Sequence, residues 1–176
     1  MYRMEINMKK LNAKHYINIF IAISVLVFID QITKVLAVRF LKDIKEFPLI
    51  KNIFVLEYLE NRGAAFGMLQ GKQFFFFFSF VILAILVLIF FFKVPATKRY
   101  LPLTICVIFI SAGAIGNSID RIRNQFVVDF FYFKPINFPV FNVADIYVTL
   151  ATIALILLIL FYYKEEDFDK LLSRRK

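Results

Sequence analysis

Few residues in this chain can serve as catalysts, and their types limit the chemistry. The 176 residues include a single cysteine, Cys106, and a single histidine, His15. One of each cannot build a His/Cys zinc site, and His15 precedes the first apolar segment, where it is a poor base for a Ser or Cys nucleophile elsewhere. Cys106 lies within an apolar stretch without a partner for an intramolecular disulfide, so we interpret it as a buried hydrophobe. Any catalysis therefore depends on carboxylates or lysine.

Two aspartates occupy positions that need an explanation. Asp129 lies in VVDFF, where a charge is costly unless it has partners. Asp145 lies in FNVADIYVT, in the first turn of a predicted helix, where compensation of the helix dipole is an equally good explanation for this acid alone. Two carboxyl groups placed close together share a proton, so that one accepts a proton from water while the other polarises a peptide carbonyl. The pattern favours such a dyad, but spacing alone leaves open whether the two acids touch.

Other polar residues gather at the same depth. Asp30 and Lys34 are four residues apart in an apolar segment, which places them on one helical face as an ion pair. A structural pair and a pair bordering an active site both stay open. In SAGAIGNSIDRIR, Asn117, Asp120 and Arg121 lie close together on nearly one face. Capping of a helix end explains one or two of these residues, but less easily all three at the level of Asp30.

Long apolar segments must position these side chains. The chain is 61% hydrophobic, yet it carries 22 Lys and Arg against 13 Asp and Glu, and these charges vanish over four stretches. Each stretch is about as long as a bilayer-crossing helix, and no signal-peptide cleavage site follows the first. We predict an all-α membrane protein with four transmembrane helices in one membrane-embedded domain, residues 1–176. The predicted spans are residues 16–38, 73–92, 101–118 and 143–163.

The basic residues predict the orientation. They are densest in the two tails and in the link between the second and third spans, so the positive-inside rule puts both termini in the cytoplasm. Because they flank apolar spans, attraction to anionic lipid explains the net charge of +9 better than nucleic acid does. The connections at about 39–72 and 119–142 then face outward.

The outward connections contain signals of structure. Residues 52–58 and the run NQFVVDFFYF are rich in β-branched and aromatic residues and predict strands, so we expect a small β-rich extracytoplasmic cap. Asn61-Arg62-Gly63 predicts a turn, and residues 64–69 predict a short interfacial helix. The Phe74–Phe78 run is interpreted as lipid-facing bulk.

The motifs resemble those of a known family, the lipoprotein signal peptidases, which are the type II signal peptidases of bacteria. The resemblance covers most of the chain apart from its tails, and the motifs also agree with the family in order and in spacing between four hydrophobic spans. The matching motifs are DQITK (30–34), EYLENRGAAFGM (57–68), GAIGNSIDRI (113–122), VVDFF (127–131) and FPVFNVADIYVT (138–149).

This resemblance implies an aspartic endopeptidase whose catalytic dyad is Asp129 and Asp145. It implies a prolipoprotein substrate that carries a diacylglyceryl group on a cysteine, cleaved just before that cysteine in the bacterial cytoplasmic (inner) membrane, near its outer face. It implies neither a metal nor an organic cofactor, and we expect a monomer whose partners are its substrates and membrane lipid. The implied substrate-binding or supporting residues are Asp30, Lys34, Asn61, Gly63, Asn117, Arg121 and Asn142.

Two other classes of protein fit the polar residues taken alone. A small ion-coupled transporter would need polar residues along the middle of several helices, whereas the centres of the second and fourth spans are almost wholly apolar. A non-catalytic assembly or chaperone subunit would use the acids only in structural pairs. The motifs favour the peptidase over both.

Overall fold

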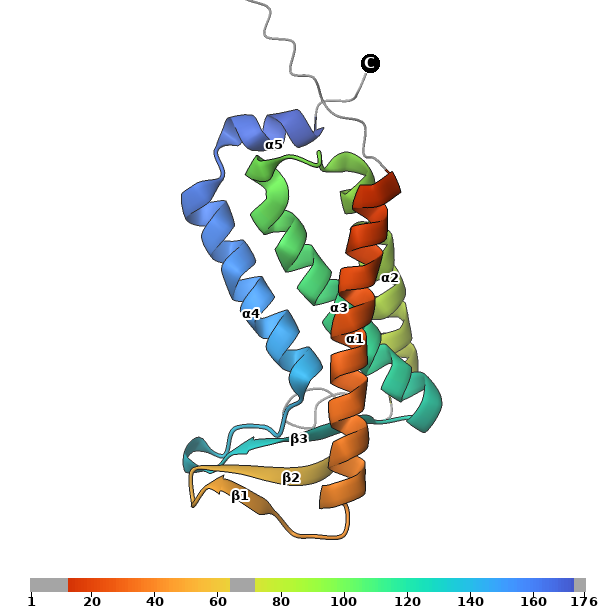
Figure 1. Ribbon diagram of the computed structural model, residues 1–176, viewed down its shortest axis with the longest axis vertical. Helices are drawn as coiled ribbons and strands as arrows, with labels where there is room; N and C mark the ends of the chain where they lie inside the picture. Colours follow the sequence, from red (N-terminus) through yellow and green to blue (C-terminus); the bar gives the residue numbers. More distant parts are fainter. Residues whose placement is uncertain (1–12, 64–71, 173–176) are drawn as a thin grey trace, which may run out of the picture.

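The computed structural model describes residues 13–63 and 72–172, which form four long helices and a small sheet. Figure 1 shows the helices running roughly side by side, with the sheet at one end and a short helix across the other. The helices are α1 (Ala13–Leu41), α2 (Gln73–Lys93), α3 (Leu101–Asn124), α4 (Val143–Leu157, continued as a π-helix to Tyr162) and α5 (Glu165–Leu172). The strands are β1 (Phe47–Ile50), β2 (Phe54–Asn61) and β3 (Val127–Phe133).

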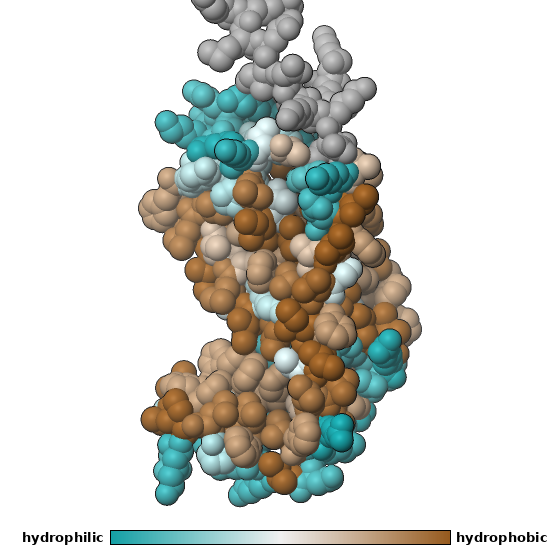
Figure 2. All heavy atoms as spheres, in the orientation of Figure 1, coloured by the Kyte–Doolittle hydropathy of each residue, from teal (hydrophilic) through white to brown (hydrophobic). Residues whose placement is uncertain are grey.

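Four of the helices are long and apolar enough to cross a membrane, which confirms the predicted fold class. Figure 2 shows a largely brown, hydrophobic middle, with teal, hydrophilic residues at the upper end and along the lower edge of the molecule. Large apolar side chains on all four helices are exposed, as expected for surfaces that face lipid. The first three membrane helices are longer than their predicted spans, whereas α4 with its π-helix ends one residue short of its span. In particular, α3 continues six residues beyond 118 and is capped by Gln125, whose φ of 64° lies in the left-handed region.

Helix α3 occupies the centre of the helix packing and contacts α1, α2 and α4. Two of its glycines allow this. A Cβ at Gly113 would lie 2.5 Å from the carbonyl oxygen of Ala144 in α4, and a Cβ at Gly116 would collide with the carboxyl group of Asp30 in α1. The short glycine surface therefore lets α1 and α4 approach α3 at the depth of the polar residues.

The strands form an antiparallel sheet in the order β1-β2-β3. The predicted 52–58 strand is found slightly later, as β2, because Asn52 adopts a left-handed turn conformation with φ 61°. Strand β3 lies within the second predicted run, whereas the sequence reasoning missed β1. A register irregularity between Leu56 and Leu59 of β2 precedes the pair Leu59–Asp129. The predicted helix at 64–69 lies outside the described residues.

Two small apolar clusters hold the ends together. At the sheet, Ala37 and Leu41 of α1 pack against Val128 and Phe130 of β3. At the opposite end the cluster comprises Val94, Tyr100, Leu103 and Tyr163. Beside it, Arg99 donates to Asp167 of α5 at 2.6 Å. The start of α1 and the helix α5 lie at the same end of the molecule, away from the sheet (Figure 1).

Candidate active site

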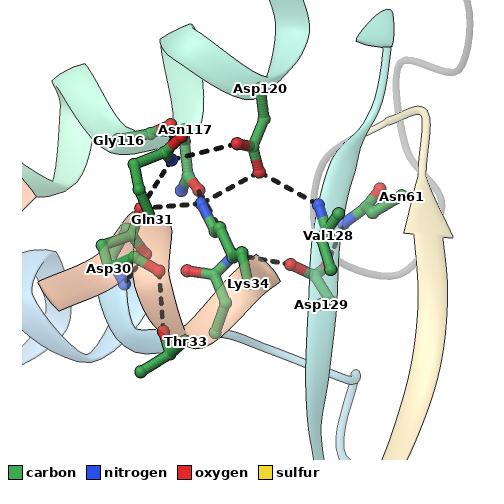
Figure 3. Close-up of polar contacts among 12 residues, drawn as sticks. Asp30, Gln31, Thr33, Lys34, Asn61, Gly116, Asn117, Asp120, Val128 and Asp129 are labelled. Atoms are coloured by element: carbon green, nitrogen blue, oxygen red, sulfur yellow. Dashed lines mark hydrogen bonds and ion pairs between the residues drawn. The ribbon is translucent and has the colours of Figure 1, made fainter. Parts of the chain in front are cut away.

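The polar residues of α1 form a buried ion-pair network at the sheet end of the helices (Figure 3). Lys34 Nζ lies 3.0 Å from Asp30 and 3.1 Å from Asp120 of α3, and all three side chains are almost fully buried. The backbone N–H of Ala144 donates to the other oxygen of Asp30 at 3.0 Å. The predicted pair thus exists, and it joins α1, α3 and the start of α4.

Gln31 is a member of this network that the sequence reasoning missed. Its Nε2 donates to Asp120 at 3.0 Å and to the carbonyl of Gly116 at 3.2 Å. The other oxygen of Asp120 accepts from the backbone N–H of Val128 in β3 at 3.1 Å. Asp120 and Asn117 both contact Lys34, as expected for residues on nearly one face, whereas Arg121 donates to the carbonyl of Gly63 instead. A carboxamide next to Asp30 inside an apolar span was the signal that could have identified Gln31.

Asn117 connects the ion-pair network to the first candidate catalytic residue. Its Oδ1 accepts from Lys34 Nζ at 2.8 Å, and its Nδ2 donates to Asp145 at 2.9 Å. The two ends of one carboxamide thus contact a cation and a carboxyl group on different helices.

Asn142 connects the two candidate catalytic residues. It caps α4: its Oδ1 accepts from the backbone N–H of Asp145, while its own N–H donates to Asp145 Oδ2, both at 3.1 Å. Its Nδ2 donates to Asp129 at 2.6 Å and to Asn117 at 3.2 Å. Asp145 thus belongs to the capping box that starts α4, and the same asparagine also contacts the second acid. Direct contact between the two carboxyl groups stays a prediction.

Asp129 is 1% exposed, in the middle of β3. Both of its oxygens accept hydrogen bonds, from Asn142 and, at 2.8 Å, from Asn61 of β2. Burial, and then the negative charge of Asp145, raise the pKa of Asp129 to about 7, against the opposing effect of the two amide donors. Asp129 thus titrates near neutral pH.

Arg121 and the turn after β2 complete the polar surroundings. The N–H of Gly63 donates to Asn61 Oδ1 at 2.9 Å, and the carbonyl of Gly63 accepts from Arg121 at 3.2 Å. The guanidinium also lies over the ring of Phe76, 4.2 Å from its centroid. One member of the Phe74–Phe78 run therefore contacts a polar residue of the site, which corrects the interpretation of that run as wholly lipid-facing.

Both aspartates line one open pocket of about 560 Å³ between the sheet, α3 and α4. A second pocket of about 290 Å³, which α2 also lines, shares Asn117, Arg121 and Asp145 with the larger one. The walls of the larger pocket are otherwise mainly apolar, as in many small-molecule and peptide sites. They comprise Asn61, Asn117, Arg121, Val127, Asp129, Phe138, Pro139, Val140, Phe141, Asp145, Ile146, Thr149 and Leu150.

The fold and the pocket define a multi-pass membrane protein with a carboxylate-rich site at one end of its helices. Residues 21–161 match the model of a protein family described as signal peptidase (SPase) II. The chain is 44% identical over 142 residues to the lipoprotein signal peptidase of Caldanaerobacter subterraneus subsp. tengcongensis, covering 80% of this chain and 94% of that protein. It is 41% identical over 146 residues to the lipoprotein signal peptidase of Clostridium tetani, covering 81% of this chain and 90% of that protein.

Solved structures agree with these relatives. A bacterial membrane enzyme determined by the in meso method at 2.3 Å resolution superposes with a TM-score of 0.71 at 30% identity, covering 90% of this chain and 93% of that one. Another bacterial membrane enzyme, determined by the same method at 1.9 Å resolution, superposes with a TM-score of 0.72 at 32% identity, covering 83% of this chain and 94% of that one. The chain belongs to the signal peptidase II family, and it is a membrane peptidase.

Proposed function

We propose that this chain is an aspartic endopeptidase that removes signal peptides from diacylglyceryl-modified prolipoproteins and cleaves just before the lipidated cysteine. Residues 1–176 form a single membrane-embedded peptidase domain in this proposal, with Asp129 and Asp145 as the catalytic dyad. The observation that carries it is the pocket in which these two acids share Asn142 as a hydrogen-bonding partner.

The chemistry follows from the different surroundings of the two acids. We assign the shared proton to Asp129, whose pKa is raised to about 7, and the role of proton acceptor to Asp145. Asp145 accepts a proton from a water, whose oxygen attacks the scissile carbonyl carbon, while Asp129 gives its proton to the carbonyl oxygen. When the tetrahedral intermediate collapses, the C–N bond breaks, the amine leaves with the proton held by Asp145, and Asp129 recovers its proton from the intermediate.

The carboxamides and the arginine serve this reaction in distinct ways. Asn61 and Asn142 hold the carboxyl group of Asp129, and Asn117 holds that of Asp145. The remaining N–H groups of Arg121, at the junction of the two pockets, are assigned to the scissile carbonyl, whose oxygen gains negative charge in the transition state. Positions that are fixed before substrate binds lower the cost of reaching the transition state.

The membrane setting fits a lipid-anchored substrate. We infer that the protein lies in the bacterial cytoplasmic (inner) membrane with both termini in the cytoplasm and the site near the outer face. Basic residues at the end opposite the sheet, among them Lys93, Lys98 and Arg99, support this orientation. A diacylglyceryl group holds the substrate in the bilayer, so its scissile bond lies at headgroup depth, where the pocket would be. The protein acts as a monomer in this proposal, with such substrates and membrane lipid as its partners.

The test is cleavage of a prolipoprotein by the full chain in vesicles. We expect the wild-type chain to cleave the diacylglyceryl-modified form and to leave the unmodified form intact. Asp129→Asn and Asp145→Asn should each abolish cleavage, whereas Asp43→Asn, which changes an exposed acid after α1, should not. A wild-type chain that fails to cleave the modified form, or folded dyad variants that cleave at wild-type rate, would refute the proposal.

A further inference from the structure

Phe76 differs from its neighbours in the run of five phenylalanines that opens α2. Phe74, Phe75, Phe77 and Phe78 are each more than half exposed, whereas Phe76 is only partly so. Its ring lies under the guanidinium of Arg121, 4.2 Å from Cζ to the ring centroid. That distance is well within the range at which an aromatic face attracts a cation.

Besides the uncharged ring of Phe76, Arg121 contacts a second group that carries no charge. Its guanidinium donates to the carbonyl of Gly63 at 3.2 Å, and no ion pair of the described residues includes it. Arg99, at the opposite end, is held instead by the carboxylate of Asp167 at 2.6 Å. A direct carboxylate partner offsets much of a cation's charge, whereas a ring face and a carbonyl orient the guanidinium and leave its charge to act on other groups.

The ring of Phe76 lies at a pocket that also contains Arg121 and Asp145, so the position of the guanidinium bears on the proposed site. Phe76 and Arg121 together line the pocket of about 290 Å³ that reaches Asp145, and both line a neighbouring apolar pocket of about 400 Å³ between α2 and α3. Arg121 also lines the larger pocket that holds Asp129 and Asp145. The guanidinium therefore lies where the three pockets meet, and the ring contacts it from the α2 side.

We propose that Phe76 is a positioning residue for the peptidase reaction: its ring face holds the guanidinium of Arg121 toward the dyad without neutralising it. This inference rests on the proposed function and assigns a task to a residue of α2. Because the ring acts through Arg121 in the transition state, its loss should lower kcat and leave KM nearly unchanged. The strength of a partly buried cation–π contact corresponds to a loss of roughly threefold to thirtyfold in kcat.

The test compares leucine substitutions at two positions of the same run. Phe76→Leu should show the loss in kcat for a lipid-modified prolipoprotein, and Phe76→Tyr should keep most of the activity because it retains the ring face. Phe78→Leu is the matched control, because Phe78 is 61% exposed and lines none of the three pockets. Both leucine variants should unfold at nearly the same temperature in detergent, so that a fall in kcat reports on the site.

Two further measurements separate a cation–π contact from simple packing. Mono-, di- and trifluorinated phenylalanine at position 76 should lower kcat in steps, because fluorine withdraws negative charge from the ring face with little change in shape. The same series at position 78 should have no effect. In an Arg121→Lys background, Phe76→Leu should lower kcat much less, because the planar guanidinium that stacks on the ring is already absent.

The outcomes are distinct. An inactive wild-type chain would overturn the proposed function, and this inference with it. An active wild-type chain in which Phe76→Leu equals Phe78→Leu, or in which fluorination leaves kcat unchanged, would overturn the role of Phe76 alone.

Discussion

Replacing Asn142 with aspartate tests whether its carboxamide controls the protonation of the dyad. Aspartate is also a good helix N-cap, so the backbone N–H of Asp145 keeps its acceptor and α4 keeps its start. What is lost are the two donor contacts of Nδ2, 2.6 Å to Asp129 and 3.2 Å to Asn117. What is gained is a third carboxyl group beside Asp129.

The size of the effect follows from these contacts. Asp129 Oδ1 loses its donor, whereas Asn117 Oδ1 still accepts from Lys34. Leaving one buried acceptor without its donor costs about 1–3 kcal/mol, so kcat at the optimal pH should fall by roughly fivefold to 150-fold. The sign of the pH effect is also fixed. The pKa of Asp129 is already raised to about 7, and an added negative charge raises it further. Because the proposed mechanism needs one ionised and one protonated acid, the pH–rate profile of Asn142→Asp should move to alkaline pH by about one unit or more.

The assay is the initial rate of prolipoprotein cleavage measured across roughly pH 5 to 10. Asn142→Ser is the matched control, since serine also caps helices but brings no charge. It should lower the rate and move the profile to alkaline pH by less than Asn142→Asp does, because the amide donor to Asp129 is lost but no negative charge is added. If the profile of Asn142→Asp superimposes on that of the wild-type chain, the carboxamide does not control the protonation of the dyad and the reasoning is refuted.

Three other substitutions test stability by thermal unfolding in detergent. The pKa of Asp129 is raised from 3.8 to about 7 in the folded chain, so the folded state loses stability as pH rises between these values. The unfolding temperature of Asp129→Asn should therefore rise relative to that of the wild type across this pH range. Above pH 7 the difference between the two should stay constant. A constant difference at every pH would contradict the burial argument. Lys34→Met should lower the free energy of unfolding by about 3–5 kcal/mol, because it leaves the buried carboxylates of Asp30 and Asp120 without their cation. Adding Asp30→Asn to this variant should restore part of the lost stability. Equal stability of Lys34→Met and wild type would show that these carboxylates are not ionised. Gly116→Ala should lower the free energy of unfolding by about 1–3 kcal/mol, because the added Cβ meets the Asp30 carboxyl group. An unchanged unfolding temperature would mean that α1 and α3 do not pack as described.

The helices were predictable because an apolar stretch of bilayer length leaves the backbone little choice other than a helix. Their ends were less so. Residues 119–124 were predicted as part of a connection, yet they continue α3, because leaving the hydrocarbon does not by itself end a helix. The helix stops only at Gln125, where the left-handed conformation satisfies the last turn.

The missed elements depend on partners that a local pattern does not contain. Strand β1 contains Pro48 and is exposed along its whole length, so it shows no alternation of buried and exposed residues, and only its pairing with β2 defines it. Helix α5 is short and carries an acid, Asp167, whose partner Arg99 lies 68 residues earlier in the chain. Periodicity within such a segment cannot indicate a contact at that separation.

For the site, residue types and depth were predictable, whereas the connections between side chains were not. The sequence indicated that Asp30 and Lys34 share a helical face, but two explanations stayed open. The structural pair is present, since Lys34 pairs with buried carboxylates, and Lys34 also donates to Asn117, the partner of Asp145. That the pair borders an active site stays a prediction. The Phe76–Arg121 contact was hidden for the same reason, because one ring among five identical neighbours carries no local signal.

The chemistry of the carboxamide explains why asparagine recurs in this site. Lys34 can only donate, and an ionised carboxylate can only accept, so a neutral group that does both can join them without adding charge. Asn117 does this between Lys34 and Asp145, and Asn142 does it between the backbone of Asp145 and the carboxyl group of Asp129. In the proposed mechanism Asp129 and Asp145 share one proton. An acid in either asparagine's place would add negative charge beside them, and a lysine would favour the ionised form of both acids. A carboxamide therefore holds both carboxyl groups in place without adding charge of either sign.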